Sequence, residues 1–351
     1  MIININPLRP EKDGIRRAAM AIRAGGLVAF PTETVYGLGA DALNDAACRK
    51  IFLAKGRPAD NPLIVHVSSV GMAEKLAYIP VALLPIIKRV WPSPLTFIVK
   101  KRTRLPDSVT ASLDTVAIRM PAHPIALALI KEADTPIAAP SANLSGKPSP
   151  TDAKTVVKDL KKSVDVILDG GPTFFGIEST VIDLRDFTLL RPGPFTPEEI
   201  EKTFGVKPRI PTAAAADETD KPASPGMKYR HYAPDTKLVL FTGRIGDLID
   251  TFSTIEKPVC LLASKETCTS IKNTNVKKII LGSRNDGYEV AKNLFTALRS
   301  IDDLGVDLAV AEAFQENGIW LAVMNRLRKA CGNVELSSKE DLLELFFTKR
   351  L

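Results

Sequence analysis

The sequence has few of the residues that build disulfide frameworks and metal centres. Its 351 residues include four cysteines and three histidines. No two cysteines form a C-x-x-C pair, and scattered cysteines of this kind indicate reduced, mostly buried thiols. The histidines, His66, His123 and His231, lie far apart in the chain, so a structural zinc site is not expected and no metal ligand is assigned.

Long hydrophobic segments are also absent. No run of about 18 apolar residues occurs, so no membrane-spanning helix is expected. The N-terminal residues MIININPLRPEKDG lack the basic-then-apolar order of a secretory leader, which favours a cytoplasmic location. The net charge of +7 indicates modest attraction to polyanions, without the concentrated basic tract of a dedicated nucleic-acid binder.

The length and the alternation of patterns predict two α/β domains. A chain of this length exceeds one ordinary core. Short apolar runs alternate with loops and amphipathic stretches over residues 1–205, and the alternation restarts over residues 236–351. Residues 206–235 lose this periodicity and are expected to form an extended linker, a possible lid over the active site. The second domain is expected to be small, parallel and Rossmann-like, with no G-x-G-x-x-G or Walker loop.

Glycines and hydroxyls follow the expected strand LVAF. In TETVYGLGADA, Gly37 and Gly39 have no side chain, which suits close approach of a small polar ligand to the backbone. A glycine turn with surface threonines is an equal alternative. Asp45 is expected to cap the helix that follows.

The segment KGRPADNPLIVH has the features of an anion-binding loop. Lys55 and Arg57 lie two residues apart, and prolines restrict Arg57 and Asn61 to extended backbone. The loop enters a short strand that stops at His66. Taken alone, the two cations would be better explained by a solvated basic turn.

Hydroxyls and arginines also follow later strands. The loop PSANLSGKPSPT offers Ser141, Asn143 and Ser149 on a proline-stiffened backbone, which suits phosphate and ribose oxygens better than a flexible linker would. Arg119 and Arg191 each end an expected strand. An arginine at a strand end is a ready bidentate partner for carboxylate or phosphate, although a salt bridge at the rim is the commoner fate of a single arginine.

These motifs together closely resemble the two-domain form of the threonylcarbamoyl-adenylate synthase family. The resemblance extends over essentially the whole chain, through KGRPADNPLIVH, PTETVYGLGADA, VAIRMPAHP, APSANLSGKPSPT, GIESTVIDL, LLRPGPFT and SPGMKYRHYAP. The first domain resembles the YrdC domain, whose K-x-R and later S-x-N are Lys55, Arg57, Ser141 and Asn143 here. The resemblance implies an α/β fold with a twisted mixed sheet, followed by the small Rossmann-like domain.

The resemblance also implies an activity. L-threonine, bicarbonate or carbon dioxide, and ATP would give threonylcarbamoyl-AMP and diphosphate, with Mg²⁺ bound mainly through ATP. The product would pass to a separate transferase complex that modifies adenosine in tRNA. Direct contact of this chain with RNA would be weak, and no membrane is involved.

Residue types at the matching positions suit this chemistry, in which no covalent nucleophile is expected. The residues expected to bind threonine are Thr32, His66, Arg119, Ser179 and Thr180. Those expected to bind ATP are Lys55, Arg57, Asn61, Thr115, Ser141, Asn143, Ser149, Arg191 and, from a folded-back MKYRHYAP segment, Tyr232.

Two other functions fit parts of the sequence. A basic, concave YrdC-like domain would hold double-stranded RNA or tRNA without catalysis, and such binding would weaken steeply with salt. The candidate residues are hydroxyls and arginines at loop ends rather than a lysine stripe, which favours a small-molecule pocket. A carbamoyl-transfer enzyme that uses carbamoyl phosphate would carry acylphosphatase and zinc-finger regions, and the sequence shows neither.

Overall fold

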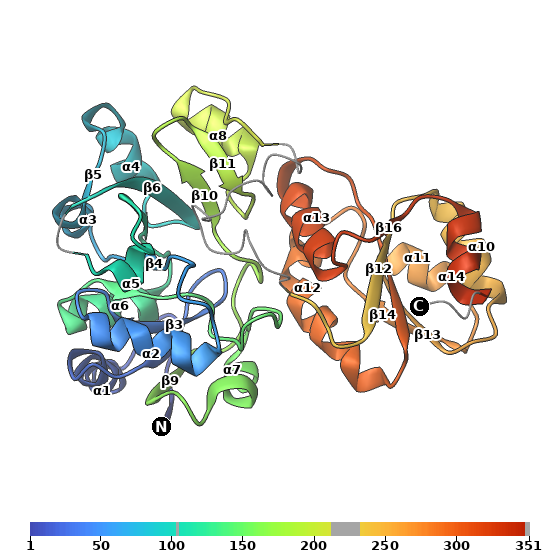
Figure 1. The fold of residues 1–351 in the computed structure, drawn as a ribbon, viewed down its shortest axis with the longest axis horizontal. Helices are drawn as coiled ribbons and strands as arrows, with labels where there is room; N and C mark the ends of the chain where they lie inside the picture. The colour runs from blue at the N-terminus through green and yellow to red at the C-terminus, as the bar shows by residue number, and fades with distance from the viewer. Residues whose placement is uncertain (103–104, 212–231, 348–351) are drawn as a thin grey trace. The chain divides into compact units, whose positions relative to one another are not determined.

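The computed structural model describes residues 1–102, 105–211 and 232–347. Of these, residues 1–145 and 149–211 form one compact unit, and residues 146–148 and 232–347 form a second (Figure 1). Most of the expected linker, including the basic and aromatic residues up to His231, lies outside the described residues. The described part of the linker includes Arg209, which forms a bridge with Thr188 of the first unit.

The first unit is built on an 11-stranded mixed sheet. Its strands follow the order β1-β9-β2-β3-β8-β4-β7-β6-β10-β11, and β5 pairs with β6 at the side. Parallel and antiparallel pairs both occur, which confirms the predicted mixed-sheet fold. The strands are β1 (Ile2–Asn4), β2 (Val28–Pro31), β3 (Tyr36–Asp41), β4 (Ile64–His66), β5 (Ala77–Tyr78), β6 (Leu95–Lys101), β7 (Thr115–Arg119), β8 (Ile137–Ala138), β9 (Val166–Asp169), β10 (Thr180–Asp183) and β11 (Thr188–Arg191).

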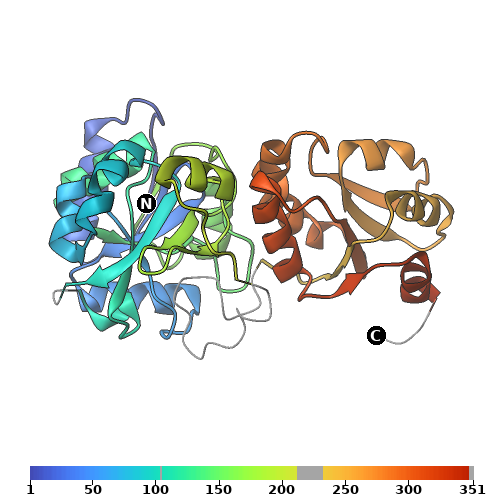
Figure 2. The ribbon, with the colours of Figure 1, turned by 90° about the horizontal axis from the view of Figure 1, so that it is seen from above.

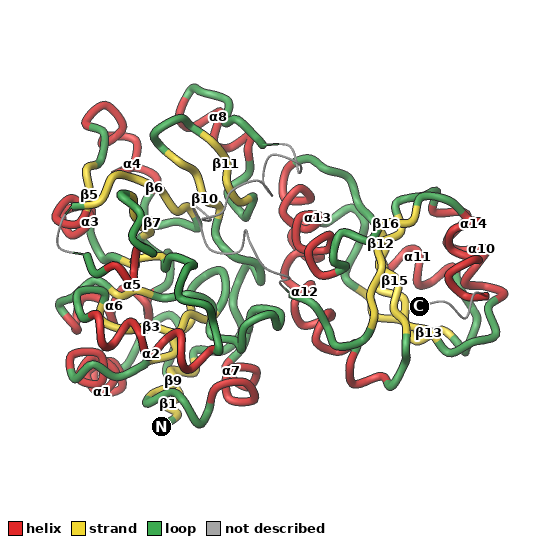
Figure 3. Tube along the Cα trace, viewed as in Figure 1, coloured by secondary structure: helices red, strands yellow, loops and turns green. Residues whose placement is uncertain are grey.

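Helices flank this sheet, as the tube in Figure 3 shows. Helices α1 and α6 lie against each other and bury one core with β2 and β9. The buried residues of α1 include Ile15, Ala18 and Ile22, spaced as one helical face requires. The helices are α1 (Lys12–Arg23), α2 (Asp45–Lys55), α3 (Val70–Leu76), the 3-10 turn η1 (Val81–Leu83), α4 (Leu84–Val90), α5 (Asp107–Thr110), α6 (Pro124–Ala133), α7 (Ala153–Leu160) and α8 (Pro197–Phe204).

Two local predictions are wrong. Asn44, not Asp45, caps α2: its side-chain oxygen accepts a hydrogen bond from the backbone N–H of Ala47, and Asp45 is the first helical residue. The segment with Gly37 and Gly39 is not a turn with surface threonines but the interior strand β3, and Thr32 and Thr34 before it are buried. A Cβ at Gly39 would lie 2.7 Å from the Phe30 ring, so packing, not ligand approach, requires this glycine.

The second unit is a parallel five-stranded sheet in the order β14-β13-β15-β12-β16. This arrangement confirms the predicted parallel α/β domain. Helices α12 and α13 pack together on one face, and α10 and α14 on the other (Figures 1 and 2). The elements are β12 (Lys237–Phe241), α10 (Ile245–Thr254), β13 (Val259–Ala263), α11 (Lys265–Ser270), β14 (Val276–Ile280), α12 (Gly287–Ser300), η2 (Asp302–Leu304), β15 (Leu308–Glu312), α13 (Gly318–Ala330), β16 (Glu335–Leu336) and α14 (Lys339–Phe347).

All four cysteines are buried and free, as predicted. Burial raises the pKa of the Cys48 and Cys260 thiols to about 12 and that of Cys268 to about 11, which keeps these thiols protonated at neutral pH. Within residues 1–102, 105–211 and 232–347, no helix combines the length and the apolar composition needed to cross a membrane.

Candidate functional site

Five neighbouring strands have ends along one edge of the first sheet, and four of them carry polar residues in register there. His66 at the end of β4 pairs with Arg119 at the end of β7. Arg119 pairs in turn with Thr96 near the start of β6, Thr96 with Val181 of β10, and Val181 with Arg191 at the end of β11. Because neighbouring strands lie about 4.8 Å apart, this register brings residues together that are up to 125 positions apart in the sequence.

Ser179 joins two members of this row. Its hydroxyl lies 2.7 Å from the Thr96 hydroxyl, and Arg191 donates to it from Nη2 at 3.0 Å. The Nε of Arg191 donates to the Ser179 carbonyl at 2.9 Å. Thr180 donates its hydroxyl to the carbonyl of Phe195 at 2.8 Å, so its side chain holds the loop after β11. Arg191 is therefore held beside the residues expected to bind threonine.

The turn after β2 supplies a chain of hydroxyls that reaches Arg119. Arg119 donates from Nη1 to the Thr34 hydroxyl at 3.0 Å, and Thr34 lies 2.8 Å from the Thr32 hydroxyl. Thr32 donates to the Val35 carbonyl at 2.7 Å, so its single hydrogen is used and Thr34 must be the donor to it. Thr32 also accepts from the backbone N–H groups of Thr34 and Val35. Its hydroxyl is thus saturated within the turn.

Arg119 forms a buried ion pair that sequence reasoning missed. Its Nη2 lies 2.7 Å from Oε2 of Glu33, and the two side chains are 4% and 6% exposed. The contact is poorly aligned, so neither atom has a hydrogen bond, and Oε1 of Glu33 and Nε of Arg119 also lack partners among the described residues. The only sequence signal was the position of Glu33 between two threonines at a strand exit. Buried polar atoms without partners are costly and rare, so this cluster is expected to bind a ligand.

His66 is a neutral member of the same cluster. Burial, together with the nearby Arg119 charge, lowers the pKa of its imidazole from 6.5 to about 3. The ring meets Phe30 edge to face at a centroid distance of 6.1 Å, and Nδ1 is buried without a hydrogen-bond partner in the described part of the chain. The imidazole can therefore donate to or accept from a polar group, but it supplies no charge at neutral pH.

Lys55 ties the K-x-R segment to the S-x-N loop. Its ammonium group donates to the carbonyls of Ser141, at 2.5 Å, and Asn143, and lies 3.5 Å from the Asn143 amide oxygen. The side chain is 2% exposed. Lys55 thus uses most of its hydrogen bonds to hold the Ser141–Asn143 loop, and its positive charge remains inside the site.

The other residues expected to bind ATP fall into two groups. Arg57 lies beside the carbonyls of Asn61 and Pro62, and Asn61 is buried with its side-chain oxygen unpartnered. Thr115 begins β7, so it lies four residues from Arg119, at the opposite end of that strand. Arg57 and Asn61 share one loop with Lys55, which contacts Ser141 and Asn143.

Ser149 belongs to the Arg119 half instead. It donates to Oε1 of Glu178 at 2.6 Å, and Glu178 directly precedes Ser179. Tyr232 is buried in the second unit, where its ring stacks on Phe295 of α12 at 4.9 Å. Contact of Tyr232 with a nucleotide stays a prediction, as does the lid, whose residues 212–231 lie outside the described part of the chain.

The described residues contain no group of three or more histidine, cysteine, aspartate or glutamate side chains arranged to hold a metal ion. Asp41, which lies near the motifs, accepts hydrogen bonds from the Thr135 hydroxyl at 2.6 Å and from the N–H of Leu43 at 2.9 Å. Its carboxylate therefore serves the fold.

Two family models match successive parts of the chain. A model described as telomere recombination matches residues 20–193, and one described as threonylcarbamoyl-AMP synthase, C-terminal domain, matches residues 195–332. The threonylcarbamoyl-AMP synthase of Pyrococcus abyssi is 49% identical over 342 residues, which cover 95% of this chain and 98% of the relative. The Bacillus subtilis enzyme of the same name is 48% identical over 325 residues, with coverage of 91% and 93%.

A solved structure agrees with these relatives. The crystal structure of Pyrococcus abyssi Sua5 complexed with L-threonine matches the present fold with a TM-score of 0.88 and 48% sequence identity. The match covers 96% of this chain and 99% of that one. Both units described above therefore have counterparts in a single homologous chain.

Proposed function

Because this chain belongs to the threonylcarbamoyl-AMP synthase family, we propose that it condenses L-threonine, bicarbonate or carbon dioxide, and ATP to threonylcarbamoyl-AMP and diphosphate. One observation in the structure supports the proposal most directly. His66 at the end of β4, Arg119 at the end of β7 and Glu33 in the turn after β2 are each buried with polar atoms that have no hydrogen bond to any described residue. A small polar ligand would satisfy these atoms, whereas a structural role leaves them unexplained.

Threonine carries groups that match this cluster. Its carboxylate would bind Arg119 through charge-assisted hydrogen bonds, with Ser179 beside it. The neutral imidazole of His66 would contact the hydroxyl and methyl end of the side chain. Selection of threonine over serine would rest on that one methyl group, which is worth about 1–3 kcal/mol.

The reaction needs positioned charge rather than a covalent nucleophile. The ammonium group of threonine first loses a proton, and the free amine then attacks carbon dioxide and loses a second proton to give a carbamate. A carbamate oxygen then attacks the α-phosphorus of ATP as diphosphate leaves. Arg191, Lys55 and Arg57 would stabilise the negative charge that grows on the phosphates. Magnesium would enter as a complex with ATP and be held mainly by phosphate oxygens and water.

The product would then be used by a separate enzyme. Threonylcarbamoyl-AMP is a mixed anhydride, and a transferase complex would pass its acyl group to an adenosine of tRNA. We place the reaction in the cytoplasm, with at most weak contact between this chain and RNA.

The proposal is tested by measuring diphosphate release from ATP by the purified chain. Release should require both threonine and bicarbonate, and omission of either should return it to the background rate. Arg119→Met should abolish release and threonine binding in calorimetry while nucleotide binding is kept. Diphosphate release that does not depend on threonine would refute the proposal. RNA binding with a steep salt dependence and no diphosphate release would also refute it.

A further inference from the structure

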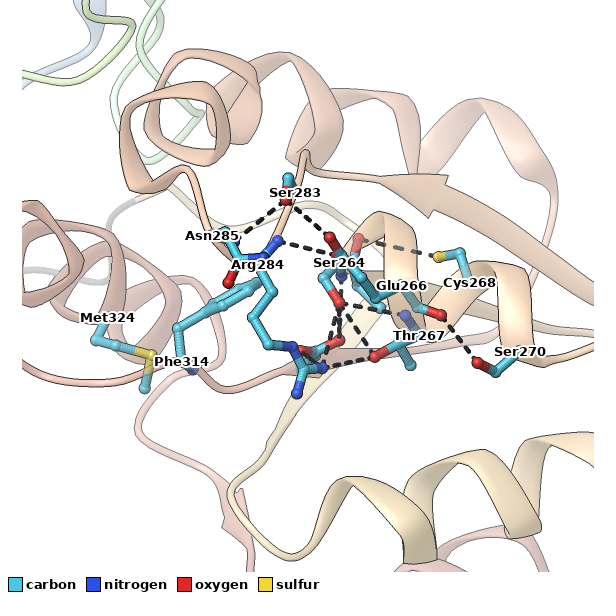
Figure 4. A network of polar contacts seen from close by, with 12 residues as sticks. Ser264, Glu266, Thr267, Cys268, Ser270, Ser283, Arg284, Asn285, Phe314 and Met324 are labelled. Carbon is cyan, nitrogen blue, oxygen red and sulfur yellow. Dashed lines mark hydrogen bonds and ion pairs between the residues drawn. The ribbon is translucent and has the colours of Figure 1, made fainter.

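Among the described residues, two arginine–glutamate ion pairs have a buried carboxylate, and the two carboxylates differ in their hydrogen bonds. In the second unit, Arg284 pairs with Glu312, whose side chain is 2% exposed. Oε2 of Glu312 accepts from the N–H and the hydroxyl of Ser264, at 3.0 and 3.1 Å, and Oε1 accepts from Arg284. Arg284 also donates to the hydroxyls of Ser264 and Thr267 (Figure 4). Both oxygens of Glu312 are satisfied, as a buried carboxylate that serves the fold requires, although Nε of Arg284 has no hydrogen-bond partner among the described residues.

Glu33 in the first unit lacks this support. Its side chain is buried too, at 6% exposed, yet neither carboxylate oxygen accepts a hydrogen bond from any described residue. Its partner Arg119 is held from the other side by the Thr34 hydroxyl, and Nε and Nη2 of Arg119 are also unsatisfied. A carboxylate and a guanidinium are thus buried side by side, and each has unused capacity for hydrogen bonds.

We propose that Glu33 binds the ammonium group of the amino acid substrate while Arg119 binds its carboxylate. This assignment rests on the proposed function and adds the residue that recognises the amine, the atom at which the carbamate forms. A zwitterionic amino acid has one cationic and one anionic group on the same carbon atom. It matches an adjacent carboxylate and guanidinium, and the four charges sum to zero in the buried site.

The charge balance gives the assignment a distinctive consequence. Glu33 competes with an incoming carboxylate for Arg119 and attracts an incoming amine. A ligand that carries only a carboxylate is therefore opposed by Glu33, and one that carries only an amine is favoured by it. A residue that merely supports the fold would affect both kinds of ligand in the same direction.

The test compares three ligands by isothermal titration calorimetry on the full-length chain: L-threonine, threoninol and 3-hydroxybutanoate. Threoninol keeps the amine without the carboxylate, and 3-hydroxybutanoate keeps the carboxylate without the amine. Glu33→Gln should weaken L-threonine and threoninol binding by about ten- to a hundredfold, as expected for loss of a charge-assisted hydrogen bond. The same substitution should tighten binding of 3-hydroxybutanoate, because Arg119 loses its competing anion.

Glu312→Gln is the matched control, since it removes the charge of the other buried carboxylate. It should leave the affinities for all three ligands unchanged. Two results would overturn the assignment of Glu33 alone, provided that the unaltered chain still releases diphosphate. One is that Glu33→Gln weakens binding of all three ligands equally, and the other is that it does not weaken binding of threonine. If the unaltered chain binds no threonine, the assignment and the proposed function fall together.

Discussion

Replacing Arg119 by methionine should destabilise the first unit by about 3–5 kcal/mol, because Glu33 would remain as a buried carboxylate without a counterion. The structure supports the upper part of this range. Both side chains are at most 6% exposed, so solvent cannot replace the lost charge, and the Thr34 hydroxyl also loses its hydrogen bond from Arg119. Methionine has nearly the length of the aliphatic part of arginine, so little of the loss would come from a cavity.

The two tryptophans allow this loss to be measured in the first unit alone. The chain contains only Trp91 and Trp320. Trp91 is buried in the first unit against Phe97, at a ring distance of 5.2 Å, and Trp320 stacks on Phe314 in the second unit. In a Trp320→Phe background, urea unfolding followed by tryptophan fluorescence reports on the first unit. The urea midpoint of the Arg119→Met variant should be lower than that of the same background without this change, and the dependence of the unfolding free energy on urea concentration should stay the same.

A double-mutant cycle separates charge from packing. Once Glu33 is glutamine, no buried anion is left behind, so Arg119→Met should cost less than about 2 kcal/mol in that background. Equal costs of Arg119→Met in the two backgrounds would show that Glu33 and Arg119 do not interact. That result would refute the description of the pair given above.

Three further changes test other parts of the structure. Gly39→Val should destabilise the first unit by at least about 1–3 kcal/mol in the urea assay, because its side chain would overlap the Phe30 ring. Glu312→Ala should lower the urea midpoint reported by Trp320 and leave diphosphate release by the first unit unchanged. The pKa of His66 is about 3 in the folded chain but 6.5 when unperturbed, so the unfolded state binds more protons and the first unit loses stability as the pH falls below 6.5. Between pH 7 and pH 5 this loss is about 2 kcal/mol, and His66→Gln should remove it from the urea unfolding curve.

The sequence predicts the strand exits of the first unit well. Apolar runs end at His66, Arg119 and Arg191, and the structure ends β4, β7 and β11 at these residues. These strand ends can be predicted because a buried strand needs a continuous apolar run, and a polar residue marks the end of that run. The hydroxyl-rich loops are readable for the same reason, since proline and glycine interrupt the periodic pattern.

The local sequence pattern does not show which strand ends lie next to each other in the sheet. Strand order and register decide that Arg119 lies between His66 and Thr96, and neither follows from hydrophobic periodicity. Glu33 and Arg119 are 86 positions apart, and no local signal links them. Strand β3 was missed because its two glycines are typical of turns in other contexts, whereas packing against Phe30 and Ile137 requires glycine at position 39.

The register also explains how one segment can serve two halves of the site. Lys55 and Arg57 precede strand β4 and His66 ends it, so the two cations and the histidine belong to opposite ends of this segment. Lys55 binds the Ser141–Asn143 loop near the start of this segment. Further along the same loop, Ser149 donates a hydrogen bond to Glu178, which lies next to Ser179. The loop after β8 therefore bridges the same two ends as β4. A nucleotide bound along this loop would bring its α-phosphate toward the Arg119 half, where the carbamate of threonine would form.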